Sequence, residues 1–271
     1  MSLEHISVAI PTYKSSKYLN RLLEKIEKIN LVNEIIISND FSDKSEEKNL
    51  EVITNKFVKR NPDKNLVFLK NKNRLGPFVN KYKAISQCRN EIVYQIDSDN
   101  LPMIKFDNFF NENLYKEFNK ENIYYPSKIY QFRTYEKFCM LGSKFSNKYK
   151  VTLSKEHNIF SKETIQEYIK NNEKIDSNKS IRWLLNIGNF IVYKNNFLDS
   201  MQEGLSYDEK YLFAADQFLI TYLWLKNRNS IELHDKHYHF HRKRNDSISF
   251  SEKERTSESF EYIERKILNL T

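Results

Sequence analysis

Glycine is scarce in this chain, and its scarcity excludes the usual nucleotide-binding loops. The 271 residues contain four glycines, at positions 76, 142, 188 and 204. A Gly-x-Gly-x-x-Gly turn and a phosphate-binding P-loop each need several glycines within a few residues, because the backbone must approach phosphate closely. No segment of this sequence meets that requirement, so a nucleotide bound by this protein must be held by side chains and a metal ion.

Cysteine and long apolar runs are also rare. Cys88 and Cys139 lack the spacing of a metal site, and a reduced cytoplasmic setting is the simplest interpretation, although a disulfide between them stays open. The longest apolar stretch, 212–225, is too short and too polar to span a bilayer. The N-terminus runs directly into an apolar run, so no signal peptide is expected. We therefore expect a cytoplasmic protein, with at most peripheral contact at the inner face of the membrane.

The charge balance is basic, with 44 Lys and Arg against 36 Asp and Glu, which gives a net charge of +8. A basic surface attracts nucleic acid, anionic lipid or small anions. Because the charge is spread along the chain and forms no basic arm, we expect no nucleic-acid partner. Enrichment in Lys, Asn, Ile and Phe is typical of an AT-rich bacterial genome, and a homo-oligomer is compatible with the sequence.

Apolar runs alternate with helical patterns through the first hundred residues. Runs at 6–10, 34–38, 66–69 and 92–96 predict four strands, and the segments between them predict helices, such as those at 45–60 and 78–87. Strands that alternate with helices at this spacing form a parallel sheet. The predicted fold class is therefore α/β, with a mostly parallel central sheet flanked by helices.

Polar residues follow each of the four predicted strands. Ligands of parallel sheets bind beyond the carboxyl ends of the strands, so we expect Thr12, Asp40, Arg74 and Asp97 to converge on one crevice. Asp40 is suited to accept hydrogen bonds from a base or ribose, and Arg74 to face a base or phosphate. The plainer alternatives are a turn residue for Asp40 and a solvated charge for Arg74.

The triplet Asp97-Ser98-Asp99 directly follows the apolar run 92–96. Two carboxylates at the exit of a buried strand suit a hard cation, because Mg²⁺ uses one or two protein carboxylates and takes its other ligands from water and phosphates. The triplet therefore predicts a Mg²⁺ or Mn²⁺ site that positions a diphosphate. The alternative is that the two aspartates only end a strand and cap a helix.

Four ordered segments resemble the inverting glycosyltransferases of family 2, which have the GT-A fold. These segments are SVAIPTY (7–13), EIIISNDFSD (34–43), NRLGP (73–77) and EIVYQIDSDN (91–100). The resemblance implies a metal-dependent transfer of a hexosyl or N-acetylhexosaminyl group, with inversion. The implied donor is a nucleotide-sugar, expected to be UDP-linked, and the acceptor is a glycan or lipid-linked hydroxyl, as in polysaccharide biosynthesis.

The resemblance also implies roles for single residues. Thr12 and Asp40 would hold the nucleobase, with Tyr13 beside them, and Arg74 would lie near the base or diphosphate. Asp97 would bind ribose or metal, and Asp99 would be the direct metal ligand. Lys81 and Ser98 complete the expected donor site. The chain departs from the family at Asn39, at Lys81-Tyr82 and at Asn100, which puts the identity of the donor in doubt more than the fold.

The second half resembles the acceptor side of the same family. In 205–219, Asp216 matches the carboxylate that serves as general base, with Asp208 as the alternative. A carboxylate in an apolar helix is costly unless it has partners or faces a cavity, and a base near the metal would take the proton from an acceptor hydroxyl. The plainer interpretation is a helix N-terminal charge favoured by the dipole. The segment NIGNFIVY (186–193) resembles a strand behind the donor sugar, or is a plain strand.

Histidines alternate at 237, 239 and 241, so they would share one face of a strand. The resemblance implies that a histidine here is a third metal ligand. We predict His241, with His239 as a close competitor, and the alternative is a basic strand that touches the diphosphate or solvent.

The predicted organisation is a donor-binding half over 1–105, an acceptor-binding half of the same domain over 106–245, and a C-terminal amphipathic helix over 246–271. A capping box at Ser251 and Glu254 begins that helix. Its stripe of Phe260, Ile263, Ile267 and Leu270 is expected to pack on the domain or on a partner, and the alternative is contact with a membrane.

Two other functions share parts of this pattern. A sugar nucleotidylyltransferase has a similar sheet but needs a glycine-rich phosphate loop after the first strand, where this chain has Pro11-Thr12-Tyr13-Lys14. A non-catalytic nucleotide- or glycan-binding protein on the same fold would bind donor and metal without needing Asp216.

Overall fold

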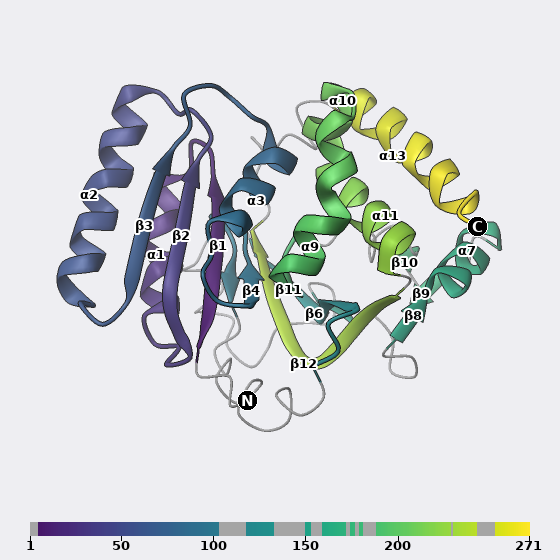
Figure 1. Ribbon diagram of the computed structural model, residues 1–271, viewed down its shortest axis with the longest axis horizontal. Helices are drawn as coiled ribbons and strands as arrows, with labels where there is room; N and C mark the ends of the chain where they lie inside the picture. Colours follow the sequence, from purple (N-terminus) through teal and green to yellow (C-terminus); the bar gives the residue numbers. More distant parts are fainter. Residues whose placement is uncertain are drawn as a thin grey trace.

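A mixed β-sheet runs through the molecule and carries helices on both faces (Figure 1). The computed structural model describes residues 5–102, 118–132, 150–152, 159–171, 174–176, 179–180, 188–228, 230–242 and 253–271. Within these ranges the main sheet has the order β3-β2-β1-β4-β11-β6-β12-β5, with β7 paired to β6 and β8 paired to β12. A separate short pair is formed by β9 (Lys174–Asp176) and β10 (Lys179–Ser180).

The first four strands are parallel, as the sequence predicts. They are β1 (Ile6–Thr12), β2 (Val32–Asn39), β3 (Asn65–Lys70) and β4 (Ile92–Gln95), and the helices between them are α1 (Ser16–Ile26), α2 (Lys44–Arg60) and α3 (Pro77–Ser86). Every residue of β1 and of β4 is buried. Continuous burial is typical of parallel strands covered on both faces, which explains why these runs are apolar without alternation.

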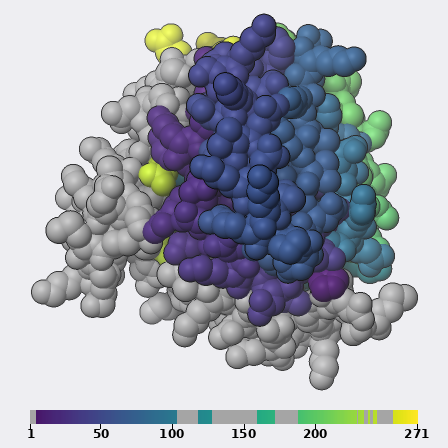
Figure 2. Space-filling model, turned by 90° about the vertical axis from the view of Figure 1, so that its left-hand side faces the viewer, coloured from purple at the N-terminus to yellow at the C-terminus, as the bar shows by residue number. Residues whose placement is uncertain are grey.

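Alternate residues of the sheet enter two separate cores. Ile35 and Ile37 of β2 face a core that includes the apolar side of α1 and α2. Ile36 faces a second core that includes α3 and the C-terminal helices. The N-terminal residues, coloured purple to blue, make a continuous face at the β3 edge of the molecule (Figure 2).

The second half of the chain extends the same sheet. Antiparallel β11 (Phe190–Tyr193) lies between β4 and β6 (Asn122–Phe132), and β12 (Ser230–Arg242) runs parallel to β6. Three shorter strands pair antiparallel with these: β5 (Leu101–Pro102), β7 (Lys150–Thr152) and β8 (Ile159–Ser161). The predicted boundaries at 105 and 245 lie outside the described residues, so the division into halves stays a prediction.

The apolar stretch 212–225 does not form one helix, which corrects the sequence-based expectation. Helix α10 (Glu209–Ala214) ends at Ala215, whose φ of −137° and ψ of 35° are not helical, and α11 (Asp216–Arg228) begins directly after it. The expectation that this stretch is buried is confirmed, because every residue from Gln217 to Leu225 is buried. The break makes Asp216 the first residue of a helix instead of an interior one.

The remaining helices cover the α3 side of the sheet. They are α7 (Lys162–Lys170), α9 (Lys194–Met201) with the 3₁₀ turn η4 (Gln202–Ser206), and α13 (Lys253–Leu268). Ile263 and Ile267 of α13 are fully buried, and α13 packs on α10, α11 and α7, as predicted. Ser251 of the predicted capping box lies outside the described residues. Across the part of the chain that the structure describes, every helix is too short or too polar to cross a membrane.

We expect Ile36→Ala to lower the free energy of unfolding by about 2–5 kcal/mol, because it leaves a cavity where a central strand meets the α3 core. Urea denaturation measures the change. Val52→Ala is the matched control, since Val52 on α2 is 45% exposed, and its effect should stay within about 0.5 kcal/mol. Similar losses in both variants would contradict the assigned core.

Candidate functional site

Polar residues at the carboxyl ends of the parallel strands are joined by hydrogen bonds. The Asp40 amide donates to the Thr12 carbonyl at 2.9 Å, which ties the end of β2 to the end of β1. The Asp40 carboxylate accepts hydrogen bonds from the backbone N–H groups of Leu75 (2.6 Å) and Gly76 (3.0 Å). Thr12, Asp40 and the loop that carries Arg74 are therefore held together, as the parallel topology predicts.

Asp40 is a buried carboxylate with specific partners. Burial raises its pKa above the usual value, while the two backbone hydrogen bonds and the nearby Arg74 charge oppose that rise. In this structure the carboxylate fixes the 73–76 loop, because two neighbouring amides of that loop point at it. Asp40 thus determines where Arg74 lies.

Arg74 stacks on two aromatic rings that come from opposite ends of the chain. Its guanidinium lies 4.5 Å from the ring centroid of Tyr13 and 5.1 Å from that of Phe213 on α10. Such cation–π contacts are individually modest, about 0.5–1 kcal/mol at exposed sites. Sequence reasoning assigned Tyr13 and Arg74 to the donor site without predicting that they stack, and it missed Phe213, which lies far away in sequence.

Gly76 allows this contact. Its φ is +82°, and a Cβ built there would lie 2.8 Å from the Phe213 ring. Glycine adopts positive φ without a steric penalty. The residue therefore lets α10 pack on the loop before α3, which brings the C-terminal helices to the donor side of the crevice.

Three hydroxyl groups link the end of β1 to the acidic triplet. The Oγ atoms of Thr12 and Ser15 are 2.6 Å apart, and those of Ser15 and Ser98 are also 2.6 Å apart. All three side chains are buried. Thr12 and Ser98 are thus brought together as predicted. Ser15, which connects them, lay in an uninformative polar stretch of the sequence.

The Asp97 carboxylate lies at the centre of a polar network. Gln95 Nε2 donates to Asp97 Oδ1 at 3.1 Å, and the Asp97 amide donates to Asn189 Oδ1 at 3.1 Å. A Cβ at Gly188 would lie 2.5 Å from Asp97 Oδ2, so a side chain at 188 would displace the carboxylate. The segment that enters β11 therefore lies directly against the acidic triplet.

Lys81 joins Asp97 to Asp216. Its Nζ lies 2.8 Å from Asp216 Oδ2 and 3.3 Å from Asp97 Oδ1, and it also donates to Gln217 Oε1 at 3.3 Å. The Lys81 side chain is 5% exposed. Burial alone would lower its pKa, but the carboxylates of Asp216 and Asp97 outweigh that effect and raise the pKa above its usual range. Lys81 is therefore a permanent buried cation between two acids.

Asp216 begins α11 with its side chain 20% exposed, so the carboxylate remains accessible while Lys81 holds one oxygen. Its position also fits the dipole of that helix, as the plainer interpretation expected, and its role as general base stays a prediction. Asp208, the alternative base, instead caps α10: its carboxylate accepts from the Lys210 amide at 2.9 Å. Its capping contact ties Asp208 to the surface of α10.

The end of β12 docks on the acidic triplet. The Arg242 amide donates to Asn100 Oδ1 at 3.0 Å, its Nε donates to the Asp99 carbonyl at 3.1 Å, and its guanidinium lies 4.4 Å from the Tyr18 ring centroid. His241, the residue before Arg242 in the strand, is exposed, and the side chain of His239 lies outside the described residues. Arg242 thereby brings the histidine-rich strand to the triplet through backbone contacts.

The predicted three-ligand metal set is not assembled. Within the described ranges, no three His, Cys, Asp or Glu side chains lie together as a potential metal site. Asp97 and Asp99 alone still supply the oxygen donors that Mg²⁺ or Mn²⁺ takes from a protein, with water and phosphate completing the shell. The donor chemistry therefore fits a divalent cation, and His241 as a ligand stays a prediction.

A family model described as Glycosyl transferase family 2 matches residues 7–182. No curated protein matches the chain in sequence. The solved structures it resembles include Staphylococcus aureus TarS 1–349 in complex with UDP, with a TM-score of 0.60 and 18% identity over 98% of this chain and 66% of that one.

Two further structures share the fold at lower identity. The mannosyltransferase PcManGT from Pyrobaculum calidifontis, in complex with GDP-Man and Mn²⁺, has a TM-score of 0.54 and 10% identity over 98% of this chain and 69% of that one. GalNAc-T7 with UDP, GalNAc and Mn²⁺ has a TM-score of 0.60 and 13% identity over 89% and 44%. The chain spans just under two thirds of the TarS fragment and less than half of GalNAc-T7.

We expect Lys81→Met to lower the free energy of unfolding by roughly 1–3 kcal/mol. This is less than for a fully buried pair, because both carboxylates keep some contact with water. The raised pKa of Lys81 means that its contribution is fully present below the unfolded value of about 10.5 and is lost only as the pH rises through the folded value. The loss should therefore be constant between about pH 6 and pH 9.

Lys70→Met is the matched control, because Lys70 also bridges two carboxylates, Glu47 and Glu51, but at the surface. Its loss should be much smaller than that of Lys81→Met, because water and salt screen a surface ion pair. Urea denaturation of both variants without added metal makes the comparison, and an equal loss would show that the buried bridge contributes no more than a surface pair.

Proposed function

The chain belongs to glycosyl transferase family 2 and has the GT-A fold, and on this premise we propose that it transfers a sugar, with inversion, from a UDP-sugar to a hydroxyl of a glycan or lipid-linked acceptor. The observation that carries the proposal is the Lys81 bridge between Asp97 and Asp216. One carboxylate lies at the donor end of the crevice and the other begins a separate helix. A carboxylate suited to hold a metal and a candidate general base therefore contact the same lysine, which supports one reaction site.

The donor side has the features of a nucleotide diphosphate site. Tyr13 and Arg74 stack on each other beside Asp40, and the Thr12, Ser15 and Ser98 hydroxyls connect the end of β1 to the acidic triplet. The TarS structures are complexes with UDP and UDP-GlcNAc, which supports uridine as the nucleoside. The transferred group in this proposal is a hexosyl or N-acetylhexosaminyl unit.

Asp97 and Asp99 are the residues that would hold Mn²⁺ or Mg²⁺ beside the diphosphate. PcManGT and GalNAc-T7 were both solved with Mn²⁺, which supports a divalent cation here. When bound, the cation would neutralise the negative charge that develops on the leaving diphosphate. The protein contributes Lys81, whose fixed charge lies against Asp97 and prevents two nearby carboxylates from repelling each other.

Asp216 is proposed as the general base. The acceptor hydroxyl oxygen bonds to the anomeric carbon, the proton moves to Asp216, and the bond to the diphosphate oxygen breaks with its electron pair. Attack from the face opposite the leaving group inverts the anomeric centre. Lys81 orients Asp216, because its Nζ donates to one carboxylate oxygen at 2.8 Å. A positioned base of this kind contributes about 10²–10⁴-fold to a rate.

We expect Asp216→Asn to lower kcat by about 10²–10⁴-fold, because the amide cannot accept the proton. UDP affinity should be unchanged, since Asp216 lies on the acceptor side. Product formation and UDP calorimetry on the same preparation measure both quantities. Asp208→Asn is the control and should keep most of its activity. If Asp216→Asn transfers sugar at the normal rate, the base lies elsewhere or the protein only binds its ligands.

We also expect UDP to bind at least about tenfold more tightly with Mn²⁺ than with EDTA, a difference of about 1.4 kcal/mol. Asp99→Asn should abolish that difference. Asp63→Asn is the control and should preserve it, because Asp63 is exposed in the turn before β3, at the amino end of that strand. Thermal shift and calorimetry report the binding, since a ligand of the folded state raises its stability. If neither UDP nor Mn²⁺ binds, and neither affects the other, the proposed donor site is wrong.

A further inference from the structure

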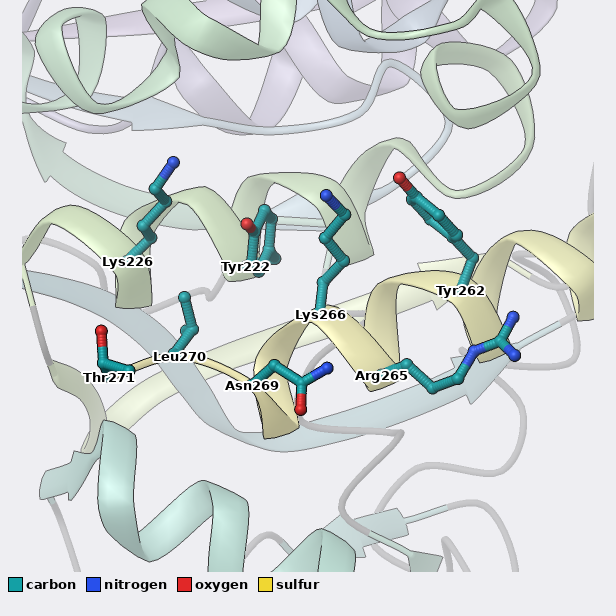
Figure 3. A pocket seen from close by; sticks show the side chains of 8 residues that line it. All are labelled: Tyr222, Lys226, Tyr262, Arg265, Lys266, Asn269, Leu270 and Thr271. Atoms are coloured by element: carbon teal, nitrogen blue, oxygen red, sulfur yellow. The ribbon is translucent and has the colours of Figure 1, made fainter.

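A second hollow lies away from the carboxylates, between α11 and α13 (Figure 3). Its volume is about 680 Å³, which is in the range of small-ligand sites. Its lining includes Tyr222 and Lys226 of α11, Tyr262, Arg265 and Lys266 of α13, and Asn269. We refer to this hollow as the basic groove. Nothing in the proposed donor chemistry uses it.

Three cations gather in the basic groove because two helices end beside each other. Lys226 lies in the last turn of α11, and Arg265 and Lys266 lie in the last turn of α13, where cations favour the helix dipole. Lys226 is paired with Glu203 at 2.5 Å. Within the described residues, Arg265 and Lys266 form no salt bridge, so two positive charges face the hollow without a carboxylate partner.

Aromatic rings form the wall beside these charges. Tyr262 stacks on Tyr211 with centroids 4.4 Å apart and an interplanar angle of 14°, and Lys266 lies 5.4 Å from the Tyr262 centroid and 5.9 Å from that of Tyr207. Stacking on Tyr211 covers one face of Tyr262, and the groove is lined by the remaining ring surface and hydroxyl group of Tyr262 together with those of Tyr222. A sugar ring presents C–H groups to such a face, while Arg and Lys bind carboxylate or phosphate.

The groove does not have the surface expected of a membrane contact. Most of the apolar stripe of α13 is already used, because Ile263 and Ile267 are fully buried in the core, and Leu270 is the one stripe residue that lines the groove. None of the large exposed hydrophobic side chains of the described residues lines the groove. A hollow with cations at its edge can admit a flexible chain, whereas a flat bilayer cannot enter it. A soluble anionic chain is therefore the occupant that fits the groove.

We propose that the basic groove binds an anionic segment of the saccharide acceptor, meaning sugar rings that carry carboxylate or phosphate groups. This inference rests on the proposed function and names the class of acceptor that the enzyme would select. Arg265 and Lys266 bind the anionic groups, and Tyr222 and Tyr262 contact the sugar rings.

The position of the groove defines how it acts. With a rise of about 1.5 Å per residue, Tyr222 lies about 9 Å and Lys226 about 15 Å along α11 from Asp216. Asp216 faces Lys81 of α3, whereas the groove faces α13. The groove therefore holds a part of the acceptor away from the reacting hydroxyl. It should lower the KM of long anionic acceptors and leave kcat unchanged.

The binding experiment compares tetragalacturonate and glucose 6-phosphate with neutral maltotetraose, using calorimetry and protein NMR. We expect at least one anionic probe to bind saturably and to shift the signals of Tyr222 and Tyr262, and maltotetraose to bind at least about tenfold more weakly. The double variant R265Q/K266Q should lose the binding. The matched control K56Q/K59Q, which removes two exposed charges from α2, should retain it.

The outcomes separate this inference from the proposed function. If R265Q/K266Q binds UDP with Mn²⁺ normally but loses the anionic probes, and if it raises KM for anionic acceptors alone, the groove is an acceptor subsite. If UDP binds and no anionic probe does, or if both double variants weaken binding equally, the inference is wrong and the donor site stands. Binding only to phosphatidylglycerol vesicles also overturns it, in favour of a membrane contact. If UDP does not bind either, the proposed function fails as well.

Discussion

The site depends on one buried ammonium group. Lys81 reaches from α3 to two carboxylates that arrive from different parts of the chain, one after β4 and one at the start of α11. Without this ammonium group the two carboxylates that it contacts would repel each other, because like charges at close range are unfavourable. The Lys81 ammonium group removes this repulsion. Its two salt bridges also connect α11 to the segment that follows β4. The same side chain therefore stabilises the packing of α11 and positions the two carboxylates of the candidate site.

Much of the fold could be predicted because its signals are local. The runs ending at Thr12, Asn39 and Gln95 are apolar without alternation, and buried parallel strands have that pattern. The parallel topology then places Thr12, Asp40 and Asp97 at the carboxyl ends of the strands, and this could be predicted before any side-chain position was known. The break at Ala215 could not be predicted in this way, since 212–225 is uniformly apolar and the backbone leaves the helix where tertiary contacts require it.

The site was less predictable than the fold because its geometry comes from residues far apart in sequence. Phe213 meets Arg74, and Asn189 meets Asp97, only after the sheet has formed. Gln95 gave a usable signal, because an amide within a buried apolar run needs a polar partner. The pairing of Lys81 with Asp216 had no such signal, since nothing local relates α3 to α11.

The close packing at Gly76 and Gly188 bears on how this protein can evolve. Each of these positions faces another side chain so closely that even a methyl group would collide, with the Phe213 ring in one case and the Asp97 carboxylate in the other. These two codons should therefore be among the last to drift, and their persistence in distant descendants would mark the retained site even after the surrounding surface has changed beyond recognition.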